Sequence, residues 1–186
     1  MKKTVKNKKI IDITKPIKIN TYLSISILGK NLNLNVSYKN IILPEIDVGS
    51  KEVNIILPIR YEGKDNIEII SKILNRMYKE IAEREIQDSL EISRYILGFA
   101  PEDYFIQEIK NGFCKTIKKD QVIIINPNIV KYNRTIIDNT IIQAFCKLRY
   151  KEGTKAYIDN LKYAIREYDL YMKNNNNVNN IKFKAI

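Results

Sequence analysis

The sequence predicts an α+β fold, on three observations: an alternating apolar pattern before residue 58, a long helical stripe in the middle, and two amphipathic helices near the end. Alternation is typical of a strand with one buried face, whereas apolar residues that recur every three or four positions are typical of a helix. A chain of 186 residues can bury the core of one domain, and two domains would be cramped.

The first alternating segment starts at Ile17 and resumes after a turn at Gly29-Lys30-Asn31, which predicts a β-hairpin. Its apolar positions are Ile17, Ile19, Leu23, Ile25 and Ile27, then Leu32, Leu34, Val36 and Tyr38. Val53–Leu57 predicts another strand, which Pro58 ends because proline has no N–H to donate to a ladder. We therefore expect an N-terminal antiparallel β-meander.

A long helix is predicted from about Asn66 to Ile96, because its apolar residues keep helical spacing. Asp65, with Glu68 three residues on, resembles a capping box at its start. Two strands, Tyr104–Lys110 and Gln121–Asn126, then predict a small sheet. Their second member contains the unbroken apolar run Val122–Ile125, which is typical of a central strand covered on both faces.

The segment Ile136–Met172 predicts two amphipathic helices hinged at Glu152-Gly153, with Thr154 as the N-cap of the second. Gln143 and Lys147 lie four residues apart and therefore project from the same face of the first helix. A zincin helix carries its two zinc-binding histidines at that spacing, with the catalytic glutamate directly after the first. In this chain the three positions hold Gln143, Ala144 and Lys147.

The segment resembles the YgjP-like family of small zinc metallopeptidases, relatives of the SprT-like group, whose helix reads I-D-Y-V-x-x-H-E-L-x-H-L with a third histidine six residues on. Matching residues are Ile137-Asp138, Ile142, Cys146, Leu148 and Thr154. Gln143 replaces the first histidine, Ala144 the glutamate, Lys147 the second histidine and Gly153 the third. Elsewhere, Val53–Pro58 resembles the family's V-x-V-x-x-P stretch, and Gly112 and Cys114 match its W-G-S-C stretch.

The resemblance implies a zincin-like single domain over residues 19–172, with a basic flexible arm at 1–18 and an asparagine-rich tail at 173–186. An active member would hold Zn²⁺ through three histidines and use the glutamate as general base, and this chain has no histidine. We therefore expect no catalytic residues, no metal and no cofactor, and a fold that works without enzyme activity. The ammonium of Lys147 would stand where the cation sits in active members, and Cys114 has no histidine to activate it.

The first function expected is a non-enzymatic binding or scaffold protein that holds an extended peptide or protein partner in the vacated cleft. The candidate binding residues are Asn111, Gly112, Lys147 and Arg149. The alternative is a basic nucleic-acid-binding module on the same fold, since the net charge is +11 and the arm holds seven lysines. The other basic residues of that alternative are Lys115, Lys118, Lys119, Lys131, Arg134, Lys147, Arg149 and Lys151.

Part of the basic charge has a second explanation, because isoleucine, lysine and asparagine dominate the sequence and share A/T-rich codons. Cys114 and Cys146 form no C-x-x-C pair, which favours reduced thiols in a cytoplasmic protein. No apolar run approaches the ~20 residues of a membrane span, and the start lacks the apolar core of a signal peptide. We therefore expect no membrane association.

Overall fold

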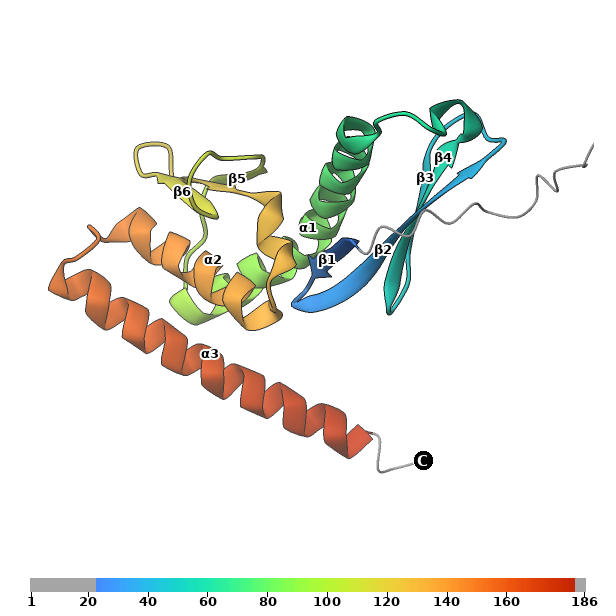
Figure 1. Cartoon of the computed structure of the whole chain (residues 1–186). Coiled ribbons are helices and arrows are strands. Elements are labelled where there is room, and N and C mark those ends of the chain that lie inside the picture. Colours follow the sequence, from blue (N-terminus) through green and yellow to red (C-terminus); the bar gives the residue numbers. More distant parts are fainter. Residues whose placement is uncertain (1–22, 183–186) are drawn as a thin grey trace, which may run out of the picture. The chain divides into compact units, whose positions relative to one another are not determined.

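The computed structural model describes residues 23–182, with side chains through Asn175, and confirms the mixed α+β fold (Figure 1). The arm at 1–18 and the first predicted strand positions, Ile17 to Thr21, lie outside the described residues. The chain divides into two compact units. Of the described residues, unit 1 holds 23–25 together with Asn31–Ile73, and unit 2 holds Ser26–Lys30 and the residues from Leu74 to Lys182.

Unit 1 is built on a four-stranded sheet in the order β1-β2-β4-β3. The strands are β1 (Leu23–Ile27), β2 (Lys30–Lys39), β3 (Glu45–Val48) and β4 (Glu52–Pro58). Paired residues of β2 and β4 bury one common face, because Leu34, Val36 and Tyr38 stand opposite Val53, Ile55 and Leu57. This buried face confirms the alternation that predicted the strands.

The predicted antiparallel meander is wrong in one pairing, because β2 runs parallel to β4. Only β3 runs antiparallel to β4. The sequence analysis missed β3, which is short and mostly exposed. Two reversals of the chain, before and after β3, return β4 to the direction of β2. Because β3 takes one edge of β4, the other edge is open to β2 and the pairing there is parallel.

The hairpin turn falls one residue earlier than predicted, at Leu28 and Gly29. Both residues have positive φ, 50° and 77°, as in the type I′ turn that matches the twist of paired strands. An added Cβ on Gly29 would lie 2.9 Å from the Cβ of Asn133. Only glycine therefore fits at this point of the turn.

A long helix, which begins in unit 1 and continues into unit 2, follows the sequence prediction closely, whereas the three-stranded sheet of unit 2 has one strand more than the two predicted. The helix α1 (Ile67–Leu97) begins where Asp65 Oδ1 accepts a hydrogen bond from the N–H of Ile67 at 3.1 Å. The strands are β5 (Asp103–Ile106), β6 (Cys114–Ile117) and β7 (Val122–Ile125), in the order β5-β7-β6. The central place of β7 is confirmed, and β6, which was not among the predicted strands, forms an edge.

Two further helices, α2 (Arg134–Arg149) and α3 (Lys155–Lys182), complete unit 2 (Figure 1). Thr154 Oγ1 accepts from the N–H of Tyr157 at 3.3 Å, which confirms its capping role, and Asn133 caps α2 in the same way. The helix α3 continues through Asn174–Asn180, which the sequence analysis assigned to an asparagine-rich tail. The tract contains no glycine or proline, and each residue added to an existing helix gains one backbone hydrogen bond.

The three helices meet at the buried carboxylate of Asp138 on α2. Arg134 Nε lies 2.9 Å from its Oδ1, Ser89 of α1 donates to Oδ1 at 2.5 Å, and Tyr168 of α3 donates to Oδ2 at 2.8 Å. Beside this cluster an apolar core joins the same helices through Ile96, Ile142, Ala164 and Tyr168. A buried charge with every partner satisfied holds α2 at a fixed position against its neighbours.

Candidate functional site

A pocket of about 250 Å³ lies between the edge strand β6 and the helix α2. Its lining consists of Gly112, Phe113, Cys114 and Thr116 from the strand side and Thr140, Gln143, Ala144 and Lys147 from the helix. Successive residues of a helix are rotated by about 100°, so the four helix residues share one face and Asp138 lies on the opposite face. Gln143, which is exposed, and Lys147, which is half-buried, therefore lie on the side of α2 that borders this pocket.

Lys147 is the cationic group of the pocket, and it forms an ion pair with Glu152. The Nζ of Lys147 lies 2.9 Å from Oε1 of Glu152, with exposed side-chain fractions of 32% and 65%. Glu152 belongs to the turn between α2 and α3, where Gly153 adopts a φ of 81°. Gly153, the position of the third histidine in the resemblance, is not part of the pocket lining.

Burial controls the chemistry of both thiols in this region. Burial raises the pKa of the Cys114 thiol from 9.0 to about 12, against an opposing effect of the nearby Lys147 ammonium. Burial also raises the pKa of Cys146 to about 11. Both thiols therefore remain protonated at neutral pH, and a protonated thiol is not a nucleophile.

The donor set of this pocket does not fit a zinc ion. Structural and catalytic zinc sites use at least three nitrogen, thiolate or carboxylate ligands, whereas the pocket offers an amide, two hydroxyls, a single thiol and an ammonium. A cation placed about 4 Å from the ammonium would meet a repulsion of about 4 kcal/mol at an effective dielectric of about 20. Among the described residues, no group of three or more His, Cys, Asp and Glu side chains is arranged to hold a metal.

The structure brings together some of the predicted binding residues and separates others. Gly112 and Lys147 line the pocket, and Asn111 directly precedes Gly112 without joining the lining. The guanidinium of Arg149 instead stacks 4.1 Å from the centroid of the Phe99 ring. Sequence reasoning missed Thr116, Thr140 and Glu152, of which only Thr140 carried a signal, three positions before Gln143 on the same helix face.

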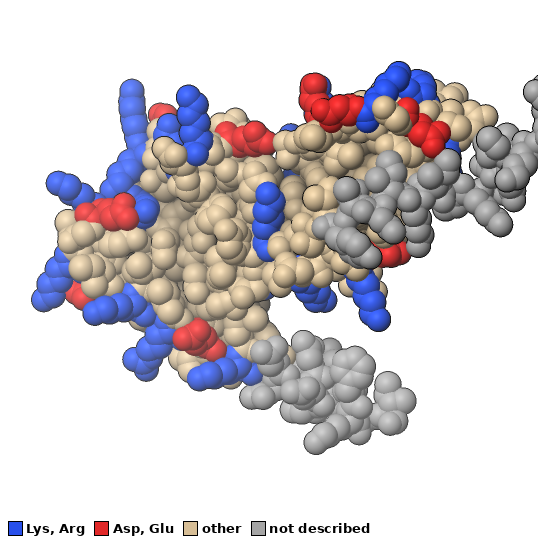
Figure 2. Space-filling view, in the orientation of Figure 1, with Lys and Arg blue, Asp and Glu red and all other residues tan. Residues whose placement is uncertain are grey.

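Several basic side chains of the nucleic-acid alternative are engaged with protein groups. Arg134 pairs with Asp138 and Glu85, and Lys131 lies over the ring of Tyr78. Lys118 donates to the carbonyl of Tyr150 at 2.7 Å. On the face shown in Figure 2, lysine and arginine side chains project separately, with Asp and Glu between them. A nucleic-acid-binding surface instead gathers its basic residues in one patch, so this arrangement gives the alternative no support.

Comparison with known proteins identifies one family. A family model described as YgjP-like, metallopeptidase domain, matches residues 1–172. Searches of curated proteins and of solved structures gave no significant match. Within the described residues, no helix is both long and apolar enough to span a membrane.

Proposed function

Because the chain belongs to the YgjP-like metallopeptidase family, we propose that it is a non-catalytic member, which binds an extended peptide or protein segment at the pocket between β6 and α2. One observation carries the proposal. The pocket is lined by Gln143, Ala144 and Lys147, the positions at which the resemblance implies two of the three histidines and the general base. The binding position is thus retained with side chains that bind without hydrolysis.

The edge strand supports a peptide as the ligand. β6 is an edge of its sheet, and Cys114 and Thr116 of β6 contribute directly to the pocket lining. An extended peptide can add to such an edge through main-chain hydrogen bonds while one of its side chains enters an adjacent pocket. Strand addition at β6 therefore brings a peptide side chain to the face of α2 that carries Lys147.

Lys147 would select the group that enters the pocket. Its ammonium donates up to three hydrogen bonds, and the Thr116, Thr140 and Gln143 side chains provide further neutral donors and acceptors. A carboxylate or main-chain carbonyl of the peptide would take over from Glu152, whose pairing with Lys147 is solvent-exposed and therefore weak. Gly112 and Asn111 would contact the peptide from the strand side, and Arg149 would contact it at the edge of the pocket.

The proposal is tested by selecting linear peptides from a displayed random library on the full-length protein. Selected peptides are synthesised, and their affinity is measured by fluorescence anisotropy with wild-type protein and two charge reversals. Lys147→Glu changes the charge inside the pocket, whereas Lys151→Glu makes the same change in the turn that follows α2, outside the pocket lining. We expect Lys147→Glu to weaken binding about tenfold or more, which corresponds to about 1.4 kcal/mol, and Lys151→Glu to leave it within about twofold.

Mass spectrometry of the same peptides after prolonged incubation with the protein and added Zn²⁺ tests the absence of catalysis. We expect intact peptides. Cleavage that Lys147→Glu abolishes would show an active enzyme and overturn the proposal. The failure of the library to yield any binding peptide, or equal affinity of the wild type and Lys147→Glu, would remove the pocket as the binding site.

A further inference from the structure

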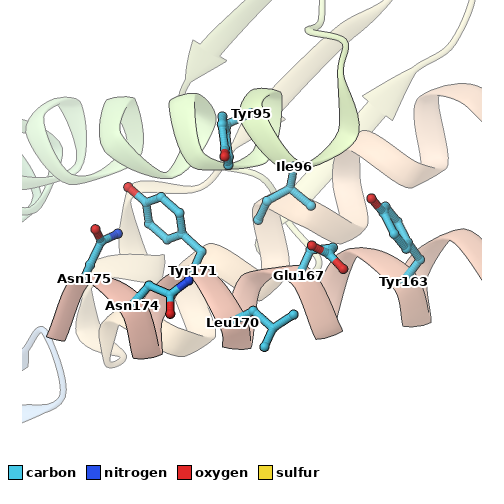
Figure 3. Close-up of a pocket in the computed structure, with 8 residues that line it drawn as sticks. All are labelled: Tyr95, Ile96, Tyr163, Glu167, Leu170, Tyr171, Asn174 and Asn175. Carbon is cyan, nitrogen blue, oxygen red and sulfur yellow. The ribbon is translucent and has the colours of Figure 1, made fainter. Parts of the chain in front are cut away.

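A second concave surface lies on unit 2, between the C-terminal half of α1 and the helix α3. It encloses about 560 Å³ and is lined by Tyr95, Ile96, Tyr163, Glu167, Leu170, Tyr171, Asn174 and Asn175. We call this surface the tyrosine groove. Figure 3 shows Tyr95 on α1, and Tyr163, Glu167 and Tyr171 following one another along α3. Nothing in the proposed peptide pocket involves these residues.

The spacing on α3 places a carboxylate between two aromatic rings. Glu167 lies four residues after Tyr163 and four residues before Tyr171, so the three side chains project from one helix face at successive turns. Tyr95 of α1 joins them, with its ring centroid 5.9 Å from that of Tyr171 and the planes tilted by 50°. Glu167 therefore has aromatic rings on both sides along the groove (Figure 3).

These aromatic side chains are not part of the core. Tyr95 is 77% exposed, Tyr163 is 54% exposed and Leu170 is 43% exposed. The core side of α3 is formed by Ala164 and Tyr168, which are buried against α1 and α2. Packing within this chain therefore explains Ala164 and Tyr168 but leaves the tyrosine groove open to a ligand.

Glu167 is a half-buried carboxylate that has no ion pair or hydrogen bond with any other described residue. The chain carries a net charge of +11, and neighbouring acidic residues on α1, such as Glu91, are paired with arginines. A carboxylate left without a cation in a basic protein, among ring faces of negative potential, is a local site for positive charge.

We propose that the tyrosine groove binds an organic cation, namely the ammonium or guanidinium group of a lysine or arginine side chain on a basic peptide. Glu167 accepts hydrogen bonds from the cation, the faces of Tyr163 and Tyr171 attract its charge, and Leu170 and Ile96 contact its alkyl stem. The amide oxygens of Asn174 and Asn175 add further acceptors. An anion is disfavoured because it would meet the Glu167 carboxylate.

The source of the cation is tested with small probes on the full-length protein labelled with ¹⁵N. The probes are N-acetyl-lysine methylamide, N-acetyl-arginine methylamide and tetramethylammonium, with neutral N-acetyl-leucine methylamide as the matched control. We expect the lysine or arginine probe to shift amide signals of residues 92–98 and 160–175 in a saturable way, with the leucine probe inactive. Stronger binding of tetramethylammonium than of both amino-acid probes would overturn the assignment, because a quaternary cation has no N–H to donate to Glu167.

Two variants test the residues that carry the site. Glu167→Gln and Tyr171→Leu are each expected to weaken binding about threefold to tenfold, which is the contribution of a partly exposed ion pair or cation–π contact. Asp169→Asn is the control, because it removes the same charge two residues away on the exposed side of α3. Equal weakening by Asp169→Asn would show a general charge effect and refute the site. Unsaturable shifts, or shifts spread evenly over the chain, would also refute it.

Discussion

Lys147 of α2 and Glu152 of the following turn form an ion pair, with 2.9 Å between Nζ and Oε1. The lysine stands at the position where the family resemblance implies a zinc ligand, and its charge is balanced by a residue five positions later in the chain. The pair joins the pocket face of α2 to the turn before α3. A ligand that engages the ammonium therefore also alters the surroundings of that turn.

A double-mutant cycle on Lys147→Ala and Glu152→Gln measures the strength of this pair. Both side chains are partly exposed, so we expect each single change to lower the free energy of unfolding by less than about 1 kcal/mol. The double variant should lose less than the sum of the two, with a coupling of about 0.2–1 kcal/mol in urea denaturation. Strictly additive losses would show that the pair contributes no stability, and would count against Lys147 as the replacement for the missing cation.

Asp138→Asn should be the most destabilising single change among the polar residues of unit 2. The substitution leaves the partly buried Arg134 without its closest counter-charge and weakens the bonds from Ser89 and Tyr168, so we expect a loss of about 3–5 kcal/mol. Asp88→Asn is the control, because Asp88 lies 3.7 Å from the same arginine but is 72% exposed. We expect less than about 0.5 kcal/mol from the control in the same denaturation experiment.

The two thiols should react slowly in the folded protein. With the pKa of Cys114 raised to about 12 and that of Cys146 to about 11, alkylation by iodoacetamide at pH 7.5 should be at least about tenfold slower than in denaturant. Equal rates in the folded and unfolded protein would show that the thiols are not protected.

The same shift of the Cys114 pKa predicts a pH dependence of stability. The unfolded thiol loses its proton near pH 9.0, whereas the folded thiol keeps its proton up to about pH 12. The contribution of Cys114 to the free energy of unfolding is therefore complete below about pH 9.0. It declines as the pH rises from about 9.0 toward about 12, because the folded state then binds more protons than the unfolded state. In denaturation curves between pH 8 and 10, Cys114→Ala should show a shallower decline than the wild type.

Gly29→Ala should cost more stability than the same change at Gly98. Both glycines have positive φ, 77° and 69°, so alanine meets a similar backbone penalty of about 1–2 kcal/mol at each. Only at Gly29 would the new Cβ also lie 2.9 Å from Asn133, whereas at Gly98 nothing lies within 4 Å. We expect thermal denaturation to show at least about 1 kcal/mol of additional loss at Gly29. Equal losses would show that the Asn133 contact relaxes freely.

The helices and buried strand faces could be predicted because apolar periodicity reports burial directly. Ile67–Leu97 differs from the predicted helix by one residue at each end, and the apolar run of β7 correctly indicated a central strand. Pairing partners could not be predicted in the same way. The parallel pairing of β2 with β4 depends on β3, whose single half-buried residue, Ile46, leaves almost no periodic signal.

The pocket could be predicted in part, because Gln143 and Lys147 lie on one helix face at the spacing of a known motif. Glu152 could not be assigned as the partner of Lys147, since its position depends on the geometry of the turn at Gly153. Arg149 lies two residues beyond Lys147 and so faces another side of α2, where it stacks on Phe99. Basic character alone did not indicate which surface its side chain would reach.

Asp138 and Lys147 lie on opposite faces of α2. The face with Asp138 holds the helix in place, and the face with Lys147 is the one presented to a ligand. Side chains on the pocket face can therefore be substituted while the contacts of Asp138 on the other face stay intact, which makes α2 suitable for redesign. Histidines introduced at 143 and 147 would stand on a helix that is already held in place, so a metal site could be built there without a new fold.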